Sequence, residues 1–229
     1  EYENIDYNIA YTYFKRKEYA TAIDAFKNYA EKSNIPKTQK NDAYLRLGDS
    51  YFVTSDYWSA MEAYNKAIAM KGIDSDYAYF QKAISYGFVD KNDRKIEDLE
   101  AFLSKYNKSI YRDDAYYELG NTYVATGNTQ KAIQSYNKLI NEQSSSSFVS
   151  KALLKQGLIY YNNDQGPKAL QKFKKVVQDY PGTEEANQAV KTARVVYVDL
   201  GRTDEYASWV STLDFVEVSD SDIDNATYE

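Results

Sequence analysis

The stretch ELGNTYVATGNTQKAI, residues 118–133, decides the fold of this chain. Gly120 lies three positions before Tyr123, a spacing that places both residues on one face of a helix. Gly127-Asn128 then breaks the helix, and Ala132 allows a second helix to pack closely at the notch that Gly120 leaves. The stretch therefore predicts two packed helices joined by a short turn.

The same pattern recurs six times along the chain, and the tyrosine is present in every copy. The spacing between successive copies is 35 to 38 residues, and a bulky residue thirteen positions after each tyrosine is placed to cover the joint between the two helices. A period of this length is the signature of a repeat solenoid. The tyrosines are Tyr13, Tyr51, Tyr86, Tyr123, Tyr160 and Tyr197, and the bulky residues are Phe26, Tyr64, Leu99, Tyr136, Phe173 and Val210.

Two copies depart from this pattern. Lys95 replaces the small residue of the second helix in the third copy, so we expect a looser joint there. Arg194 and Tyr206 replace both small residues in the sixth copy. Such departures are typical of a terminal repeat, which has no neighbour to pack against on one side.

The segments at residues 47–51 (LGDSY) and 118–133 resemble the tetratricopeptide repeat (TPR) family, and the resemblance covers about residues 4–216. It implies an all-α fold, a right-handed α-α superhelix of about six helix-turn-helix repeats. The opening at residues 113–116 (DDAY) and the ending Tyr180-Pro181 are similar to repeats of bacterial envelope-associated members. The resemblance thus favours the bacterial periplasm or envelope over the cytoplasm.

We expect the solenoid to occupy residues 1–217, and a linker with the start of a further helix to occupy residues 218–229. The sequence begins without Met and ends inside the expected further helix, so we expect a segment of a longer protein. The six repeats are placed at about residues 4–36, 40–73, 76–108, 113–145, 150–182 and 186–216.

Composition excludes several classes of function. The chain has 28 Lys and Arg against 34 Asp and Glu, a net charge of −6, so it lacks the positive field that nucleic-acid binding requires. With no Cys and no His, it has no thiol nucleophile, imidazole base or metal site built from these side chains. No apolar run is long enough to span a membrane. We therefore expect no enzyme activity, no cofactor and no nucleic-acid partner.

Acidic residues form two candidate sites, each with a simpler explanation. The aspartates at alternate positions from Asp220 to Asp224 have the spacing that opens a calcium loop, but Asn225 occupies the position where such a loop needs Gly. We therefore expect a helix cap within a linker. The pairs Asp113-Asp114 and Glu184-Glu185 are expected to open helices, where they offset the helix dipole, rather than to act as general acids.

Ligand contacts in the TPR family usually come from the inner faces of the first helices. The resemblance assigns four positions in each of five repeats to that face, among them Phe14, Asp42, Tyr77 and ten residues that form the candidate groove. Their side chains predict an aromatic, mildly acidic groove, suited to an extended or helical segment with apolar anchors. The Lys and Asn clamp by which chaperone-binding members grip a terminal carboxylate is absent from these positions. The ten residues are Tyr7, Tyr11, Leu45, Asp49, Phe80, Ile84, Tyr117, Asn121, Leu154 and Tyr161.

These features together predict a non-enzymatic protein-interaction scaffold whose partner, another protein or peptide, binds in the groove. Tight superhelical packing would instead bury the same aromatic residues against neighbouring helices. In that case the chain is a structural spacer or accessory module of a larger multi-repeat protein, with no specific groove ligand.

Overall fold

The computed structural model describes residues 3–215, and the regular secondary structure in that range is entirely helical. The expected linker and the aspartates from Asp220 to Asp224 lie outside the described residues. Along the described range, the twelve helices are α1 (Glu3–Lys15), α2 (Tyr19–Ala30), α3 (Lys37–Val53), α4 (Tyr57–Ala69), α5 (Ser75–Gly87), α6 (Asn92–Lys105), α7 (Arg112–Ala125), α8 (Thr129–Glu142), α9 (Phe148–Asn162), α10 (Gly166–Asp179), α11 (Glu184–Asp199) and α12 (Thr203–Val210).

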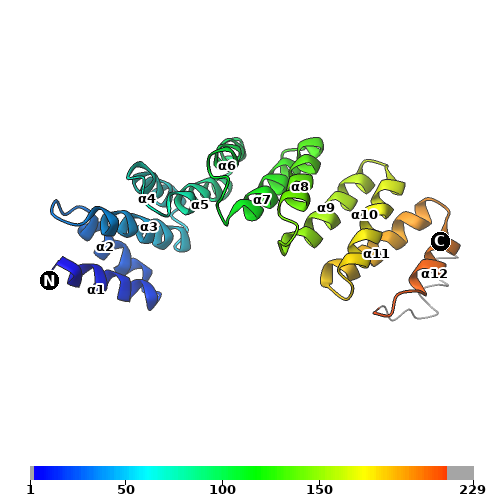
Figure 1. Cartoon of the computed structure of the whole chain (residues 1–229), viewed down its shortest axis with the longest axis horizontal. Helices are drawn as coiled ribbons and strands as arrows, with labels where there is room; N and C mark the ends of the chain where they lie inside the picture. Colours follow the sequence, from blue (N-terminus) through cyan, green and yellow to red (C-terminus); the bar gives the residue numbers. More distant parts are fainter. Residues whose placement is uncertain (1–2, 216–229) are drawn as a thin grey trace. The chain divides into compact units, whose positions relative to one another are not determined.

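Consecutive helices form antiparallel pairs, which build a solenoid of about six helix-turn-helix repeats (Figure 1). Each repeat contains a first helix with an odd number and a second helix with an even number. First helices of consecutive repeats also contact each other, as α1 does with α3 and α9 does with α11. The prediction of an all-α solenoid is confirmed. The first helices of these neighbouring repeats lie side by side.

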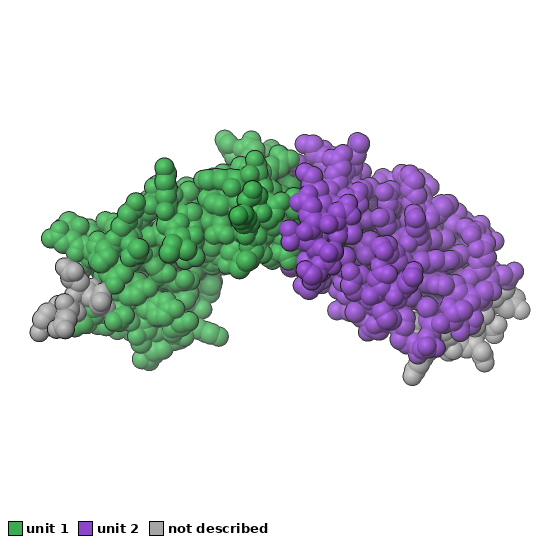
Figure 2. All heavy atoms as spheres, viewed as in Figure 1, with its two compact units in different colours: residues 1–122 green, residues 123–229 purple. Residues whose placement is uncertain are grey.

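The chain divides into two compact units, which Figure 2 shows in different colours. Unit 1 comprises residues Glu1–Thr122 and unit 2 comprises residues Tyr123–Glu229, so the boundary falls inside α7.

An aromatic ring from the second helix fills the notch that a glycine leaves in the first helix. A Cβ added at Gly48 would clash with the ring of Tyr64 in unit 1, and a Cβ added at Gly157 would clash with the ring of Phe173 in unit 2. Both rings are buried almost completely. The predicted role of the bulky position, covering the joint between the helices, is therefore confirmed in these two repeats.

The turn between the two helices of a repeat has the same backbone geometry in all six copies. The residue four positions after the repeat tyrosine has a positive φ, and the next amide donates a hydrogen bond of 2.8–2.9 Å to the tyrosine carbonyl. Glycine adopts this conformation without strain, yet four of the positions carry a different residue. The six residues are Lys17 (φ 62°), Ser55 (φ 64°), Asp90 (φ 57°), Gly127 (φ 78°), Asp164 (φ 56°) and Gly201 (φ 64°).

Replacing Ser55 by Gly is expected to raise the free energy of unfolding by about 0.5–1 kcal/mol, because a residue with a Cβ is strained at this positive φ. Thr54→Gly is the control, since Thr54 has an ordinary φ of −86°, and Gly there adds freedom to the unfolded chain and removes the hydrogen bonds of the Thr54 hydroxyl to the Ser50 and Tyr51 carbonyls. The control should therefore be destabilised. Urea unfolding followed by circular dichroism measures both variants, and a loss of stability in Ser55→Gly would contradict the prediction.

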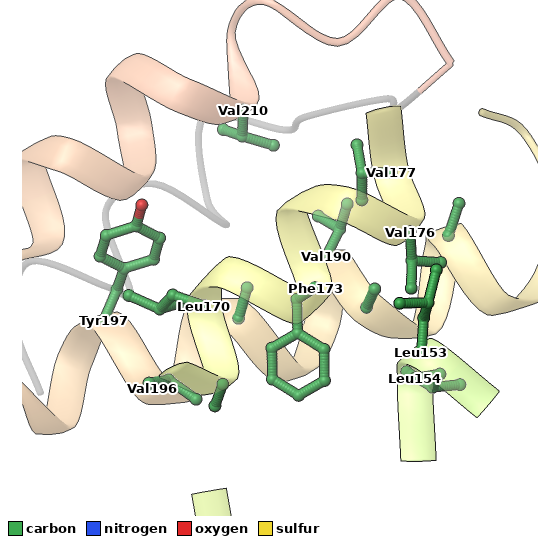
Figure 3. Close-up of a cluster of buried hydrophobic side chains, with 14 of the residues drawn as sticks. Leu153, Leu154, Leu170, Phe173, Val176, Val177, Val190, Val196, Tyr197 and Val210 are labelled. Carbon is green, nitrogen blue, oxygen red and sulfur yellow. The ribbon is translucent and has the colours of Figure 1, made fainter. Parts of the chain in front are cut away.

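The core of unit 2 is built from the facing sides of α9, α10 and α11. Figure 3 shows Phe173, Val176 and Val177 of α10 among side chains of the neighbouring helices, with Leu153 from α9 and Val190 from α11. All of these residues are nearly inaccessible to solvent. Helix packing therefore stabilises this unit mainly through apolar burial at each crossing.

Lys95 in α6, where the sequence predicts a looser joint, has a buried side chain. Its stem lies near Gly87, which leaves room for it, and its Nζ lies 2.6 Å from a carboxylate oxygen of Glu118. A long basic residue thus replaces the usual alanine because a glycine and a carboxylate accommodate it. Whether the joint is looser stays a prediction.

Candidate functional site

The ten residues predicted for the groove fall into two groups by exposure. Six keep part of the side chain at the surface, whereas four are covered by the chain's own helices and are 1–8% exposed. The partly exposed residues are Tyr7, Tyr11, Ile84, Tyr117, Asn121 and Tyr161, and the buried residues are Leu45, Asp49, Phe80 and Leu154.

The buried apolar members of this set belong to the core. Leu45 packs in a cluster with Tyr64, and Leu154 packs in the cluster of unit 2 that contains Phe173. Phe80 lies with its ring centroid 5.9 Å from that of Phe102. These three residues stabilise the repeats, so a partner would contact the partly exposed residues instead.

Three aromatic side chains of α1, which we name the aromatic row, follow one face of the helix. Tyr7, Tyr11 and Phe14 are spaced four and three residues apart, and their consecutive ring centroids are 6.1 and 6.3 Å apart. Each ring is partly exposed. Tyr29 from α2 lies 5.5 Å from the Tyr7 ring, and the Arg46 guanidinium lies 5.9 Å from the Phe14 ring. The row is therefore held in place by both neighbouring helices.

A polar network connects this row to α3. The Tyr7 hydroxyl donates a hydrogen bond to Oδ2 of Asp42, and Arg46 Nη2 donates to Oδ1 of the same carboxylate at 3.3 Å. Arg46 Nη1 donates to Oδ2 of Asp49 at 2.8 Å. Asp42, Arg46 and Asp49 meet because spacings of four and three residues place them on one face of α3.

Asp49 is the centre of the network and is only 8% exposed. Besides Arg46, two tyrosine hydroxyls donate to its Oδ1, Tyr64 at 2.9 Å and Tyr77 at 2.7 Å. These tyrosines belong to α4 and α5. A single carboxylate therefore links three consecutive helices, and its hydrogen bonds satisfy a charge that would otherwise be costly to bury.

Burial dominates the protonation equilibria of the network. It raises the pKa of the Asp49 carboxyl, and hydrogen bonds from Tyr77 and Tyr64 oppose that rise. Burial also raises the pKa of Tyr64 and of Tyr77, and the nearby Asp49 carboxylate adds to both shifts. Burial acts to lower the pKa of Arg46, but Asp42 and Asp49 outweigh it, so that pKa is raised.

These shifts indicate what the network can do. Tyrosines with raised pKa values stay protonated at neutral pH, so Tyr64 and Tyr77 act as hydrogen-bond donors and not as nucleophiles. Arg46 stays charged and keeps 27% of its side chain exposed beside the aromatic row. The arrangement positions side chains at a surface, which suits recognition rather than bond-making chemistry.

The face continues from α5 to the loop before α7. The Tyr111 ring stacks on Phe80 with centroids 5.7 Å apart and lies 5.5 Å from the ring of Tyr77. In the same loop, the Ser109 hydroxyl donates a hydrogen bond of 2.6 Å to Oδ2 of Asp76. The network at Asp49 is thereby connected, through Tyr77, to the start of α7.

The sequence prediction omits two residues of this face. Arg46 could have been found, because Asp42, Arg46 and Asp49 have the helical spacing expected for side chains that pair. Tyr111 has no such signal, since it lies in a loop and reaches Phe80 only through tertiary packing.

In unit 2, the two predicted groove residues do not form a comparable network. Leu154 is buried, and the hydroxyl of Tyr161 donates a hydrogen bond of 2.7 Å to Oδ2 of Asp199. This bond links the first helices α9 and α11 at an exposed position. Unit 1 therefore provides the better-defined candidate site.

A metal site or a membrane span would each leave a recognisable feature in residues 3–215. Within that range, no group of three or more acidic side chains is arranged to hold a metal ion. Among the helices of the same range, none is both long enough and apolar enough to cross a membrane.

Comparison of the sequence with protein families gives matches over more than half of the chain. Three family models, each described as Tetratricopeptide repeat, match residues 7–77, 113–145 and 151–183. No curated protein matches the chain.

Solved structures with a similar fold include the crystal structure of MamA, which is 25% identical, with a TM-score of 0.61, over 74% of this chain and 93% of that one. The apo form of RapI is 15% identical, with a TM-score of 0.72, over 92% of this chain and 64% of that one. A MamA fragment from Desulfovibrio magneticus RS-1 is 18% identical, with a TM-score of 0.63, over 77% of this chain and 93% of that one. At 15% and 18% identity, the similarity to RapI and to the MamA fragment shows a shared fold and nothing more.

Proposed function

This chain is a tetratricopeptide repeat protein, and we propose that it is a non-enzymatic scaffold. The family generally mediates protein–protein interaction. In this proposal, the chain binds a peptide segment of another protein on the first-helix face of unit 1. The observation that carries this proposal is the aromatic row, which stays partly exposed while the polar network holds it in place.

Pre-organisation is the physical argument for binding at this face. Tyrosine and phenylalanine rings bury a large apolar area, and their few rotatable bonds lose little entropy on binding. Here Tyr7 is already fixed by its hydrogen bond to Asp42, and Phe14 lies under the Arg46 guanidinium. A partner would therefore meet a rigid aromatic surface with a charged edge, the composition that binding hot spots favour.

A structural spacer is the competing function. In a spacer, the polar network serves only to fasten α1, α3, α4 and α5 together, and the exposed rings have no ligand. The four groove residues that are buried support this alternative. The two functions differ in whether removal of an exposed ring changes binding.

The test is selection of displayed random peptides on the immobilised chain, followed by fluorescence anisotropy with the recovered peptides. Tyr11→Ala should weaken their binding about tenfold, because Tyr11 contributes an exposed ring without a place in the polar network. Trp58→Ala is the control, as Trp58 is a ring that is 59% exposed on the second helix α4. Failure to recover any peptide, or equal affinity in Tyr11→Ala, would favour the spacer.

A further inference from the structure

One side of α1 carries three exposed side chains, which we name the outer stripe. Ile5, Ile9 and Thr12 are spaced four and three residues apart, so they follow one another along a single face of the helix. Ile5 is 47% exposed, Ile9 is 45% exposed, and Thr12 is exposed as well. The Thr12 hydroxyl already donates a hydrogen bond of 2.7 Å to the Asn8 carbonyl. The stripe is therefore apolar in character and loses no hydrogen bond when it is covered.

The equivalent stripe is covered in the later first helices. Counted from the repeat tyrosine, the position of Ile5 is alanine in α3, α5, α7, α9 and α11, and each alanine is 0% exposed. The position of Thr12 is buried in the same five helices. The position of Ile9 is buried in four of them, and in α5 it is Lys82, whose side chain is 14% exposed. The five alanines are Ala43, Ala78, Ala115, Ala152 and Ala189.

The second helix of the preceding repeat covers these alanines. In unit 1, Ala43 packs in one cluster with Phe26 of α2. In unit 2, Ala189 packs in one cluster with Phe173 of α10. A side chain as small as alanine lets the two helices approach closely. The outer stripe of α1 has no such cover within the described residues, as the exposure of its isoleucines shows.

Ile5 is too large for the packing used inside the solenoid. If a repeat stacked on α1 as α2 stacks on α3, Ile5 would occupy the place of Ala43 and would overpack the crossing. A solvated end of a solenoid needs a polar surface instead, yet the outer stripe carries two isoleucines. The stripe therefore fits neither the close contact between consecutive repeats nor a face that stays in water.

The charged groups of α1 beside the outer stripe have partners within the chain. Asp6 forms an ion pair with Lys32, and Arg16 Nε lies 2.8 Å from Oε1 of Glu18. Lys15 Nζ lies 5.2 Å from the centroid of an aromatic ring of the same helix. The three residues of the stripe are uncharged. A second copy of the stripe can therefore approach the first without bringing unpaired like charges together.

We propose that the outer stripe is the contact between two copies of this chain, in which the α1 helices pack antiparallel about a twofold axis. Such a contact needs only one surface, and it places Ile9 against Ile9 of the partner subunit. An ordinary helix crossing leaves about 8–10 Å between the two axes, which accommodates isoleucine side chains. One helix stripe is smaller than the interface of a permanent dimer, so the association is weak and depends on concentration.

Self-association leaves the aromatic row accessible. Helical spacing places Tyr7 and Phe14 on the side of α1 opposite to Ile5. A dimer therefore presents two copies of the face that is proposed to bind a peptide segment, and a partner with two such segments would bind it more tightly than a partner with one. The dimer itself does not depend on that proposed function.

Sedimentation velocity of the full chain, from about 1 µM to about 500 µM, should show the mean mass rising from 26.4 kDa towards twice that value. Ile5→Ser with Ile9→Ser should weaken the self-association at least about tenfold, because it removes the apolar area of the stripe. The matched control is Ile73→Ser with Ile110→Ser, at two isoleucines that are 94% and 79% exposed, and it should associate as the parent does. Circular dichroism should show the same helix content in all three proteins.

Opposite charges at Ile9 test the twofold geometry. Ile9→Lys and Ile9→Glu should each stay monomeric, because like charges would meet at the axis, whereas an equimolar mixture of the two should form a mixed dimer. A mixture that stays monomeric would show that the stripe does not meet itself. A parent chain that is monomeric at every concentration, or equal association of the parent and the Ile5→Ser with Ile9→Ser variant, would also overturn the proposal and leave the stripe to another partner. The peptide-binding proposal would stand in each of these cases.

Discussion

Replacing Asp49 by Ala is expected to lower the free energy of unfolding by about 3 kcal/mol, because the substitution leaves one guanidinium and two hydroxyl groups without their shared acceptor. Arg46, Tyr64 and Tyr77 all donate to this carboxylate, which is only 8% exposed. The expected loss is not larger because Asp42 still pairs with Arg46. Urea unfolding followed by circular dichroism gives the value, and hydrogen exchange should place the loss in α3, α4 and α5.

Two further variants test the cause of this loss. Asp24→Ala removes an exposed carboxylate of α2 and should change stability by less than about 0.5 kcal/mol. Asp49→Leu combined with Arg46→Met removes both charges and should restore the part of the stability that the unpaired guanidinium cost, whereas the Tyr64 and Tyr77 hydroxyls still lack their acceptor. If Asp49→Ala unfolds at the same urea concentration as the parent, the network is not important for stability.

Replacing Phe173 by Ala should lower the free energy of unfolding by about 3–5 kcal/mol, because it empties the centre of the joint between α9 and α10. The Phe173 side chain is 0% exposed and fills the notch at Gly157. Figure 3 shows its ring among the buried side chains of unit 2. Large core residues that are truncated in this way lose their transfer free energy and leave a cavity as well. Urea unfolding measures the change, and hydrogen exchange should show the loss of protection in α9 and α10.

A substitution in α9 tests the same joint between α9 and α10. Gly157→Ala should cost about 1–3 kcal/mol through overpacking, and Phe173→Leu in the same chain should recover part of that loss by making room for the new methyl group. Val195→Ala is the control, at an apolar residue that is 47% exposed on α11. Additive losses in the double variant would mean that the glycine and the ring do not share one space.

Much of the fold was predictable from local spacing. The tyrosine that recurs in each repeat, with a small residue three positions earlier in the first five, indicates the first helix and its contact face. The turn that follows was visible as Gly127-Asn128 in one copy. Its recurrence at Lys17 and Ser55 was not, because a positive φ in a residue other than glycine has no clear sequence signal.

The candidate site was only partly predictable. Tyr7 and Tyr11 are partly exposed, as a groove requires, whereas Leu45 and Leu154 are in the core. The resemblance to the TPR family assigned all four to the inner face, but it does not distinguish the part of that face that the neighbouring repeat covers. Exposure depends on how closely two repeats approach each other, and the side chains of both repeats determine that distance.

The sequence by itself determined that the chain is helical, that its repeat contains two helices, and that most joints pair a small residue with a bulky one. These properties arise from contacts within one repeat, where helical spacing places the residues together. Only the tertiary structure decided that Asp49 accepts a hydrogen bond from Tyr77, 28 residues away, and that the Tyr111 ring stacks on Phe80. Those arrangements depend on the stacking of separate repeats, which local periodicity does not specify.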